Sequence, residues 1–392
     1  MKKLVLSLSI VALFLGSCSS DNEEITTDPI PTGTISGEIT TAESYPKGNY
    51  TIQGTVKVKN GGSLTIEAGS VITAVLTDGS DALLVENGGK LFLNGTAALP
   101  IVFTEASKTP GSWGGIIMVG DAPIVGAKSV ATATTEDGNN LPYGGTNDTH
   151  NGGTLKYVRV EYAGKKLTDN TSEMNGFSFY SVGSGTVLEN LVAYKGADDG
   201  FEFYGGTVSA KNLISYGNFD DSFDWQDGWR GDANTNWYAY QVVTGNYGME
   251  IEAKSINNAF GPKVSNITLT RAAGTVTEGG SSANEFDAIQ FKKEGNGEYT
   301  NVVISGYTTS NTTLTATAVR IQDKSTNDNQ VTGGKIKMLN VKINDGTSQF
   351  AGVGTTFTVA FPTGNYTTSS TATGATLTAG AWAIVDGVSL IK

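Results

Sequence analysis

The sequence is poor in the residues that most often carry covalent cross-links, metal sites and nucleophilic catalysis. Its 392 residues include one cysteine, Cys18, and one histidine, His150. A single cysteine excludes an intrachain disulfide and leaves no pair for thiol chemistry. The sequence also lacks a Gly-x-Ser-x-Gly elbow, a P-loop and a histidine-rich zinc motif. Serine-hydrolase, nucleotide-binding and zinc-site functions are therefore excluded at the level of motifs.

Charged residues are scarce, and most of them are acidic. They make up 16% of the chain, the formal net charge is −12, and the sequence pI is about 4.7. Nucleic acid is excluded as a partner because its binding depends on basic contacts to phosphate. Divalent cations suit so acidic a chain better. With 51 glycines, the composition is typical of a turn-rich, all-β extracellular protein.

Long apolar runs are also missing, apart from one at the N-terminus. Lys2 and Lys3 precede an apolar run at residues 4–15 that is too short to span a bilayer, as in a signal peptide. The run ends in Leu-Gly-Ser-Cys at residues 15–18, which resembles a bacterial lipobox. We therefore expect a lipoprotein signal peptide at residues 1–17 and lipidation of Cys18. The alternative is an ordinary secretory signal followed by a chance cysteine.

What the sequence does contain is a repeat. LVAYKGADDGFEFYGG at residues 191–206 is followed by LISYGNFDDSFDWQDG at 213–228, a step of 22 residues, and a second pair of similar strings begins at Asn60 and Asn87, 27 residues apart. Steps of this length, made of short alternating strands with no room for a helix, predict a β-solenoid. We expect an all-β, right-handed parallel β-helix forming one elongated domain, with successive rungs about 4.8 Å apart.

The pattern sets the domain organisation. Residues 18–33 read as the lipidated cysteine and a flexible tether, residues 34–345 as the β-helix, and residues 346–392 as C-terminal strands and a cap. Within the β-helix the repeat breaks at an Asn/Gly/Thr-rich insertion near residues 126–153, which predicts a loop projecting from the wall. We expect His150, inside that insertion, to be solvated.

Three strings carry a family resemblance: GSWGGII at residues 111–117, NGGTLKYVRVEYAG at 151–164 and DDGFEFYGG at 198–206. They resemble secreted lipoproteins of the Bacteroidota with a right-handed parallel β-helix, over about residues 50–345. The resemblance implies the fold and a surface location, and it implies no particular activity. The acidic start at residues 21–24 is similar to surface-export signals of such lipoproteins. We expect a monomer anchored by lipid to the outer membrane and exposed at the cell surface.

Aligning the strands by phase divides their residues into inward and outward columns. Phenylalanines at 177, 201 and 223 form one inward column, and Phe179, Phe203 and Trp225 form the next. The outward column between them contains Ser178, Glu202, Asp224, Glu250, Gln290 and Arg320. Carboxylates one rung apart repel each other, which raises a pKa or recruits a cation. The acidic column is therefore the candidate site.

Two further groups of residues flank this column. Trp229 and Trp237 fall between strands, where exposed aromatic rings would grip a sugar; with Tyr204, Glu202, Asp224 and Glu250 they make the predicted ligand site. Asp220, Asp224 and Asp227 are a candidate Ca²⁺ site, because hard oxygen ligands suit that ion. The competing interpretation of the paired aspartates at 198–199 and 220–221 is a ladder of turns. Ca²⁺ is the one cofactor the pattern suggests, and none is required.

We expect a binding or adhesion module for a glycan or another cell-surface polymer. The alternative is a polysaccharide lyase or glycoside hydrolase that uses Glu202, Asp224 and Glu250 with Arg230 and Arg320, since carboxylates about 5 Å or 10 Å apart match glycosidase spacings. The paired aspartates are similar to those of polygalacturonase-type hydrolases. The Gly-His-Gly of that family has no counterpart in this sequence, and its Arg-x-Lys element is matched only in part, at residues 320–322.

Overall fold

A computed structural model describes residues 29–76, 81–167, 173–277, 285–308, 315–353 and 356–392. The compact unit Pro31–Lys392 holds the fold of the described residues. The signal peptide, Cys18 and most of the tether predicted for residues 18–33 lie outside the described residues. Within the described part of the chain, no helix is long and apolar enough to cross a membrane.

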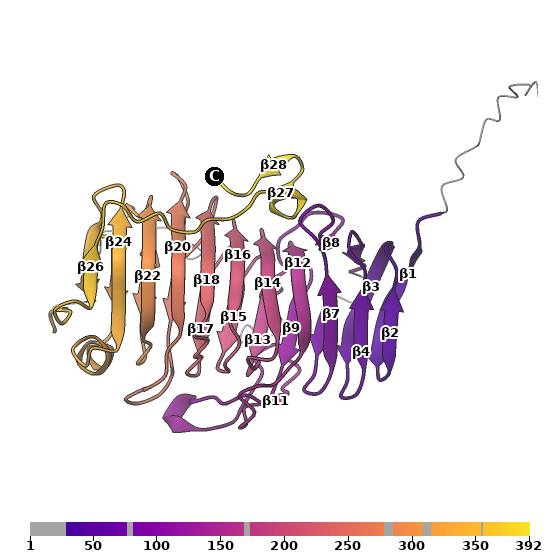
Figure 1. The fold of residues 1–392 in the computed structure, drawn as a ribbon, viewed down its shortest axis with the longest axis horizontal. Helices are drawn as coiled ribbons and strands as arrows, with labels where there is room; N and C mark the ends of the chain where they lie inside the picture. The colour runs from indigo at the N-terminus through magenta and orange to yellow at the C-terminus, as the bar shows by residue number, and fades with distance from the viewer. Residues whose placement is uncertain (1–28, 77–80, 168–172, 278–284, 309–314, 354–355) are drawn as a thin grey trace, which may run out of the picture. The chain divides into compact units, whose positions relative to one another are not determined.

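One sheet of 24 strands, paired in parallel throughout, builds this unit (Figure 1). The prediction of an all-β parallel β-helix is confirmed. Strands succeed one another in rungs, so that each strand pairs with the strand one turn later. The first rungs use β1 (Thr32–Ile39), β2 (Ala42–Tyr45), β3 (Asn49–Val58), β4 (Ser63–Ile66), β5 (Val71–Ala74), β7 (Lys90–Asn94) and β8 (Ile101–Glu105).

The other strands of the sheet form two ladders, one of long strands and one of short strands. The long-strand ladder consists of β12 (Gly153–Glu161), β14 (Val187–Tyr194), β16 (Ala210–Tyr216), β18 (Asn234–Gln241), β20 (Lys263–Arg271), β22 (Gly297–Ser305), β24 (Ile336–Ile343) and β26 (Tyr366–Thr368). The short-strand ladder consists of β6 (Ala82–Val85), β9 (Ile116–Val119), β13 (Phe177–Tyr180), β15 (Phe201–Tyr204), β17 (Phe223–Gln226), β19 (Met249–Ile251), β21 (Ile289–Phe291), β23 (Thr317–Ile321) and β25 (Ser348–Gly352).

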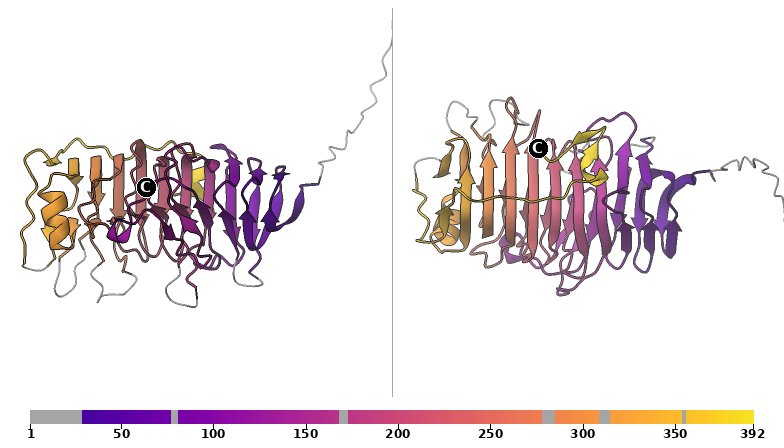
Figure 2. Two further views of the ribbon diagram at one scale, coloured as in Figure 1. Left: turned by 90° about the horizontal axis from the view of Figure 1, so that it is seen from below. Right: turned by 45° about the horizontal axis from the view of Figure 1, so that its top comes forward.

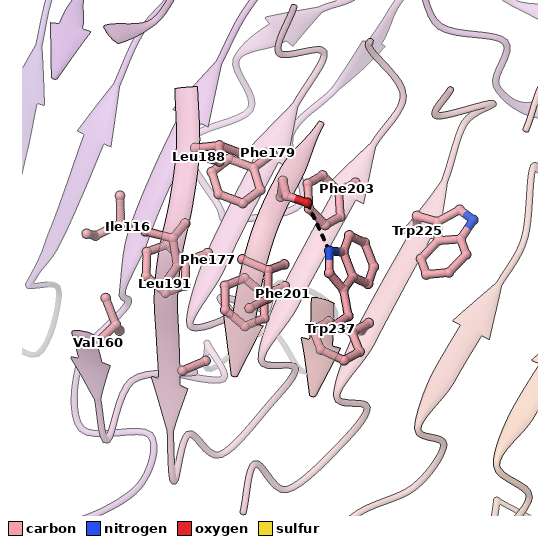
Figure 3. Close-up of a cluster of buried hydrophobic side chains, with 14 of the residues drawn as sticks. Ile116, Val160, Phe177, Phe179, Leu188, Leu191, Phe201, Phe203, Trp225 and Trp237 are labelled. Carbon is pink, nitrogen blue, oxygen red and sulfur yellow. Dashed lines mark hydrogen bonds between the residues drawn. The ribbon is translucent and has the colours of Figure 1, made fainter. Parts of the chain in front are cut away.

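The register of the repeat is as the sequence predicts. Leu191 pairs with Leu213 across the 22-residue step, and Leu64 pairs with Leu91 across the 27-residue step. The phenylalanine columns point into the core, where the Phe177 and Phe201 rings stack with centroids 5.0 Å apart (Figure 3). Alternation along the short strands therefore places large aromatic side chains inside and leaves the residues between them on the outer side.

An asparagine ladder bends the long strands. The residues at this bend are in the left-handed region, with φ between 56° and 60°, and they are Asn190, Asn212, Asn236, Asn266, Asn301 and Asn340. Asparagine tolerates this conformation better than most residues. The amides also stack along the axis, since Nδ2 of Asn212 donates to Oδ1 of Asn190 and Nδ2 of Asn236 donates to Oδ1 of Asn212, both at 3.0 Å.

The insertion near residues 126–153 is present and contacts the short-strand ladder. It contains a turn of 3₁₀ helix (Ala127–Ser129) and the antiparallel pair β10 (Ala133–Thr134) and β11 (Pro142–Tyr143). The Tyr143 ring contacts Tyr180 at 5.1 Å and Tyr204 at 6.2 Å between centroids. These contacts hold one side of the insertion against the outer side of β13 and β15, while residues 127–132 and 146–149 are exposed.

The last residues do more than cap the helix. α1 (Lys324–Thr326) and a π-helical turn (Asn327–Val331) precede β24, and aromatic side chains of β25 and β26 pack at this end. Residues 369–392, which we call the return segment, then run back over the long strands through a 3₁₀ turn (Ala381–Ala383), β27 (Ile384–Val385) and β28 (Val388–Ser389) (Figure 2). Apolar side chains of the return segment bury an outward tyrosine cluster.

Candidate functional site

The outward column predicted from sequence has the predicted register. Ser178, Glu202, Asp224, Glu250, Gln290 and Arg320 pair in succession from β13 to β23. The column is not an open face, however. Glu202 is only 6% exposed and Asp224 only 9% exposed, because loops before and after the short strands and the insertion rise around them. The column forms the floor of a pocket instead of a flat surface.

This acidic pocket has a volume of about 260 Å³ and lies over β15, β17 and β19. Carboxylates dominate its wall, with three lysines on one side. Its lining consists of Glu136, Glu173, Asp198, Asp199, Glu202, Tyr204, Asp220, Asp221, Asp224, Gln226, Tyr247, Glu250, Glu252, Lys254, Glu285, Lys292 and Lys293. Eleven carboxylates against three ammonium groups make it strongly electronegative.

The paired aspartates serve both as turn residues and as pocket wall. Asp199 Oδ1 accepts the backbone N–H of Asp221 at 2.9 Å, and Asp221 Oδ1 accepts that of Tyr247 at 2.6 Å. Each of these bonds joins one rung to the next, and the turn-ladder interpretation of the pairs stays a prediction. Each carboxylate fixes the next rung through one oxygen, and this geometry brings the side chains of successive rungs together in the pocket.

Burial and mutual repulsion raise the pKa of most of these carboxyl groups. Asp198, Asp199, Asp221 and Asp224 have pKa values well above the usual range, first because burial penalises the anion and then because neighbouring carboxylates repel it. The same two causes raise the pKa of Glu202 to about 8. Hydrogen bonds from Tyr204 and Gln226 work against that rise by favouring the charged form.

Glu202 has the most complete set of partners. Asn175 Nδ2 donates to Oε2 at 2.7 Å, Gln226 Nε2 donates to Oε1 at 2.9 Å, and the Tyr204 hydroxyl also donates to Oε2. Tyr204 therefore belongs to the pocket, as predicted, although its ring is buried and only the hydroxyl end reaches the lining. These contacts fix Glu202 in one orientation at the floor.

The lysines stand together at one side of the pocket. Lys292 pairs with Glu250, Lys293 lies 2.8 Å from Glu252 and Lys254 lies 3.5 Å from Glu252, each distance measured from Nζ to a carboxylate oxygen. Although burial alone would raise the pKa of Glu252, the three ammonium groups hold it below the usual range. The carboxylates raise the pKa of Lys254 and Lys292 in spite of burial, so these lysines stay protonated at neutral pH.

The predicted aromatic platform does not exist. Trp229 and Trp237 are 1% and 0% exposed, and their indole N–H groups donate to Val208 O and Ala210 O at 3.0 Å each. Trp237 lies on β18 and points into the core, where the close-up shows it below Phe203 (Figure 3). The expectation that these residues face a ligand is wrong, because each rung turns its largest aromatic side chains inward.

Neither predicted arginine lines the pocket. Arg320 lies at the end of the column, where its Nε and Nη2 pair with the two oxygens of Asp287 at 2.9 Å and 3.0 Å. Arg230 stacks on Phe260, 3.6 Å from the ring centroid, and burial lowers its pKa. Paired with Asp287, Arg320 lies outside the pocket lining, as does Arg230.

Two further expectations fail under the insertion. Asp227, predicted to share a Ca²⁺ ion with Asp220 and Asp224, accepts a hydrogen bond from the Tyr143 hydroxyl and is absent from the pocket lining. His150 is 5% exposed rather than solvated, and its Nδ1 accepts the N–H of Gly183 at 3.3 Å. The packing of the insertion determines the surroundings of both residues. Because the insertion contains no repeat, its packing could not be predicted from the sequence.

Three groups of carboxylates could hold a metal ion in the described residues. In each group one oxygen per residue lies within 4.8 Å of the others: Asp198, Asp199 and Asp220; Asp199, Glu202 and Asp224; Asp221, Asp224 and Glu250. Each group includes at least one predicted site residue: Asp220 in the first, Glu202 and Asp224 in the second, and Asp224 and Glu250 in the third. Asp198, Asp199 and Asp221, which the sequence interpretation assigned to turns, complete them. The Asp-Asp pair that recurs at residues 198–199 and 220–221 was the signal in the sequence that could have identified these carboxylates as site residues.

Stacked parallel rungs with a polar pocket over the short strands define a parallel β-helix. The chain belongs to the family described as the pectate-lyase-like β-helix domain, whose model matches residues 33–385. No curated protein and no solved structure shows a significant match to the chain. The family match supports the fold part of the resemblance stated above and leaves the lipoprotein part a prediction.

Proposed function

We propose that this protein binds a carbohydrate polymer at the acidic pocket, as a lipoprotein anchored at Cys18 and displayed at the outer membrane surface. The observation that carries the proposal is the pocket itself, a hollow lined by charged and polar side chains over β15, β17 and β19. Membership of the pectate-lyase-like β-helix family supports a carbohydrate ligand. The two sources of evidence are independent, since one is geometry and the other is sequence similarity.

The lining suits hydrogen bonding more than stacking. Carboxylates accept hydrogen bonds from sugar hydroxyl groups, and the ammonium groups of Lys254 and Lys292 donate hydrogen bonds to sugar hydroxyl oxygens. With the two tryptophans in the core, Tyr204 and Tyr247 are the aromatic residues of the described lining, and both rings are buried. The excess of carboxylates disfavours polyuronates and sulfated polymers through repulsion. We therefore propose neutral or amino-sugar polymers as the ligand class.

The test is an affinity panel of neutral, amino-sugar and uronate polysaccharides with the full-length protein and three variants. Asp224→Asn and Glu202→Gln change the pocket floor while keeping side-chain size. Glu189→Gln is the matched control, because Glu189 pairs with Lys156 at 3.0 Å on the long-strand ladder. We expect at least tenfold weaker binding in the two pocket variants and unchanged binding in the control. Equal losses in all three, or no ligand in the panel, would contradict the proposal.

A glycoside hydrolase is the second candidate, because Glu202, Asp224 and Glu250 lie on adjacent rungs. Rungs about 4.8 Å apart place neighbouring carboxylates near the spacing of retaining enzymes. Glu202, with a pKa raised to about 8, would be the acid and a neighbouring carboxylate the nucleophile. A lyase is disfavoured, since Lys254 and Lys292 in the pocket are held protonated and both predicted arginines lie elsewhere. New reducing ends that appear with wild type and vanish with Glu202→Gln would make the protein a hydrolase.

The lipid anchor is tested separately from the pocket. Replacing Cys18 by serine should abolish incorporation of a labelled fatty acid and release the protein from the membrane fraction. Surface display predicts that externally added protease removes the protein from intact cells. Resistance in intact cells with sensitivity after lysis would place it on the inner side and overturn the surface assignment.

A further inference from the structure

Arg271 is a buried guanidinium that lies outside the lining of the acidic pocket. It ends β20, where Ile267, Leu269 and Arg271 alternate with more exposed residues, so its side chain points inward and is 3% exposed. Nη1 donates to Gln241 Oε1 at 3.3 Å and to Asn246 O at 2.9 Å. Nε and Nη2 are buried and have no hydrogen-bond partner in the described structure. Both acceptors are neutral amide oxygens, so neither balances the positive charge.

Arg320 shows how this fold balances an arginine that is buried to the same extent. Its Nε and Nη2 pair with the two oxygens of Asp287 at 2.9 Å and 3.0 Å. For Arg271, burial lowers the pKa, and the more distant Asp287 and Asp221 oppose that fall. Asp287 is already paired with Arg320, and burial raises the pKa of Asp221 well above the usual range, which favours its uncharged form. Because an unbalanced buried charge is costly, a counter-anion beside Arg271 would stabilise the fold.

Hydroxyl groups without hydrogen-bond partners lie in the same part of the solenoid. The Tyr307 ring is fully buried, its hydroxyl has no partner in the described structure, and its centre lies 5.9 Å from Cζ of Arg271. A Cβ on Gly248 would lie 2.7 Å from that hydroxyl, and Arg271 binds Asn246 in the same turn. Thr244 Oγ1, two residues before Asn246, is also buried without a partner. N–H and O–H groups that lack partners are complementary to an anion.

We propose that Arg271 binds one small monovalent anion of the halide class through Nε and Nη2, with the Tyr307 hydroxyl as a further donor. One guanidinium balances one negative charge, whereas Asp221 and Asp287 would repel the second charge of sulfate or phosphate. A water molecule would satisfy the free N–H groups and leave the charge unbalanced. The anion would stabilise the turn that carries Tyr247, a residue of the pocket wall. The site does not depend on the ligand of the acidic pocket.

The test is thermal unfolding of the full-length protein in sodium chloride and in sodium gluconate at the same ionic strength. Chloride at about ten times its Kd should raise the Tm of wild type by about 2–3 °C over gluconate. Bromide should have the same effect. Crystals grown in sodium bromide should give an anomalous peak within hydrogen-bond distance of Arg271 Nε and Nη2. Equal Tm values in chloride and gluconate, or no peak at Arg271, would overturn the proposal.

Variants separate loss of the anion from loss of the fold. Arg271→Met removes the charge, keeps an unbranched side chain and should abolish the chloride-dependent rise in Tm. Tyr307→Phe keeps the buried ring, so it remains informative if Arg271→Met does not fold, and it should weaken chloride binding at least threefold. Tyr299→Phe is the matched control, since its hydroxyl donates to Asn296 O at 2.9 Å, and it should respond like wild type. An undiminished chloride response in Arg271→Met or Tyr307→Phe would contradict the site whatever the carbohydrate panel gives.

Discussion

At the scale of single residues, His150 shows how the insertion changes the chemistry of a side chain. Burial lowers its pKa below 6.5, and Nδ1 accepts the Gly183 N–H, so the neutral form carries its proton on Nε2. A folded-state pKa below the unfolded value means that stability is lost as the pH falls below about 6.5. Because it is the sole histidine, its NMR titration is unambiguous.

We expect this titration to give a pKa below 6.5, and His150→Gln to lose less stability than wild type between pH 7 and pH 5. Glutamine keeps an acceptor for Gly183 and cannot titrate, so it controls for the many acidic groups that respond to the same change of pH. A measured pKa at or above 6.5, or identical losses in the two proteins, would contradict the burial of His150.

At the scale of elements, the asparagine ladder determines where each long strand bends. Asn212 has φ of 59° and shares amide hydrogen bonds with Asn190 and Asn236. Asn212→Gly should lose the hydrogen bonds alone, about 1–2 kcal/mol of unfolding free energy. Asn212→Ala should lose about 1 kcal/mol more, because alanine is strained in the left-handed region. Urea unfolding of the two variants checks this order, and alanine no worse than glycine would refute it.

Trp382 of the return segment is buried, with its ring 5.8 Å from that of Tyr157. Trp382→Ala should weaken docking by about 3 kcal/mol and make residues 369–392 sensitive to protease. The rungs beneath should remain resistant, since their own core is intact. Val388→Ala is the matched control, because Val388 is half exposed. Equal cleavage rates in the two variants would show that the segment is held in another way.

At the scale of the whole molecule, the repeat predicted the residue positions that depend on pairing between rungs. It did not predict the contacts made by segments outside the repeat. Aligning the strands by phase placed Glu202, Asp224 and Glu250 in one column, and the structure has them in register. Their burial depends on loops and on an insertion with no periodicity, so sequence alone could not supply it. The orientation of Trp229 failed for a similar reason, because it lies in a turn after β17 where alternation ends.

One available signal was overlooked. An asparagine precedes an apolar residue in six successive long strands, β14 to β24, as in Asn190-Leu191, Asn212-Leu213 and Asn236-Trp237. Reading this step as a bend would have placed Trp237 on the inward side of a strand before the structure was known. The partner of Arg320 could not have been found in this way, since Asp287 lies in a loop between rungs whose length varies along the chain.

The most direct test of the pocket as the ligand site is carboxyl footprinting by carbodiimide labelling and mass spectrometry, with and without a polysaccharide that binds. Asp220 and Glu250, both partly exposed in the pocket, should be protected by the ligand. Glu189 and Glu298, partly exposed on the long-strand ladder, should label equally in both states. Protection of Glu189 and Glu298 with unchanged labelling of Asp220 and Glu250 would contradict the assignment and move the site to the long strands.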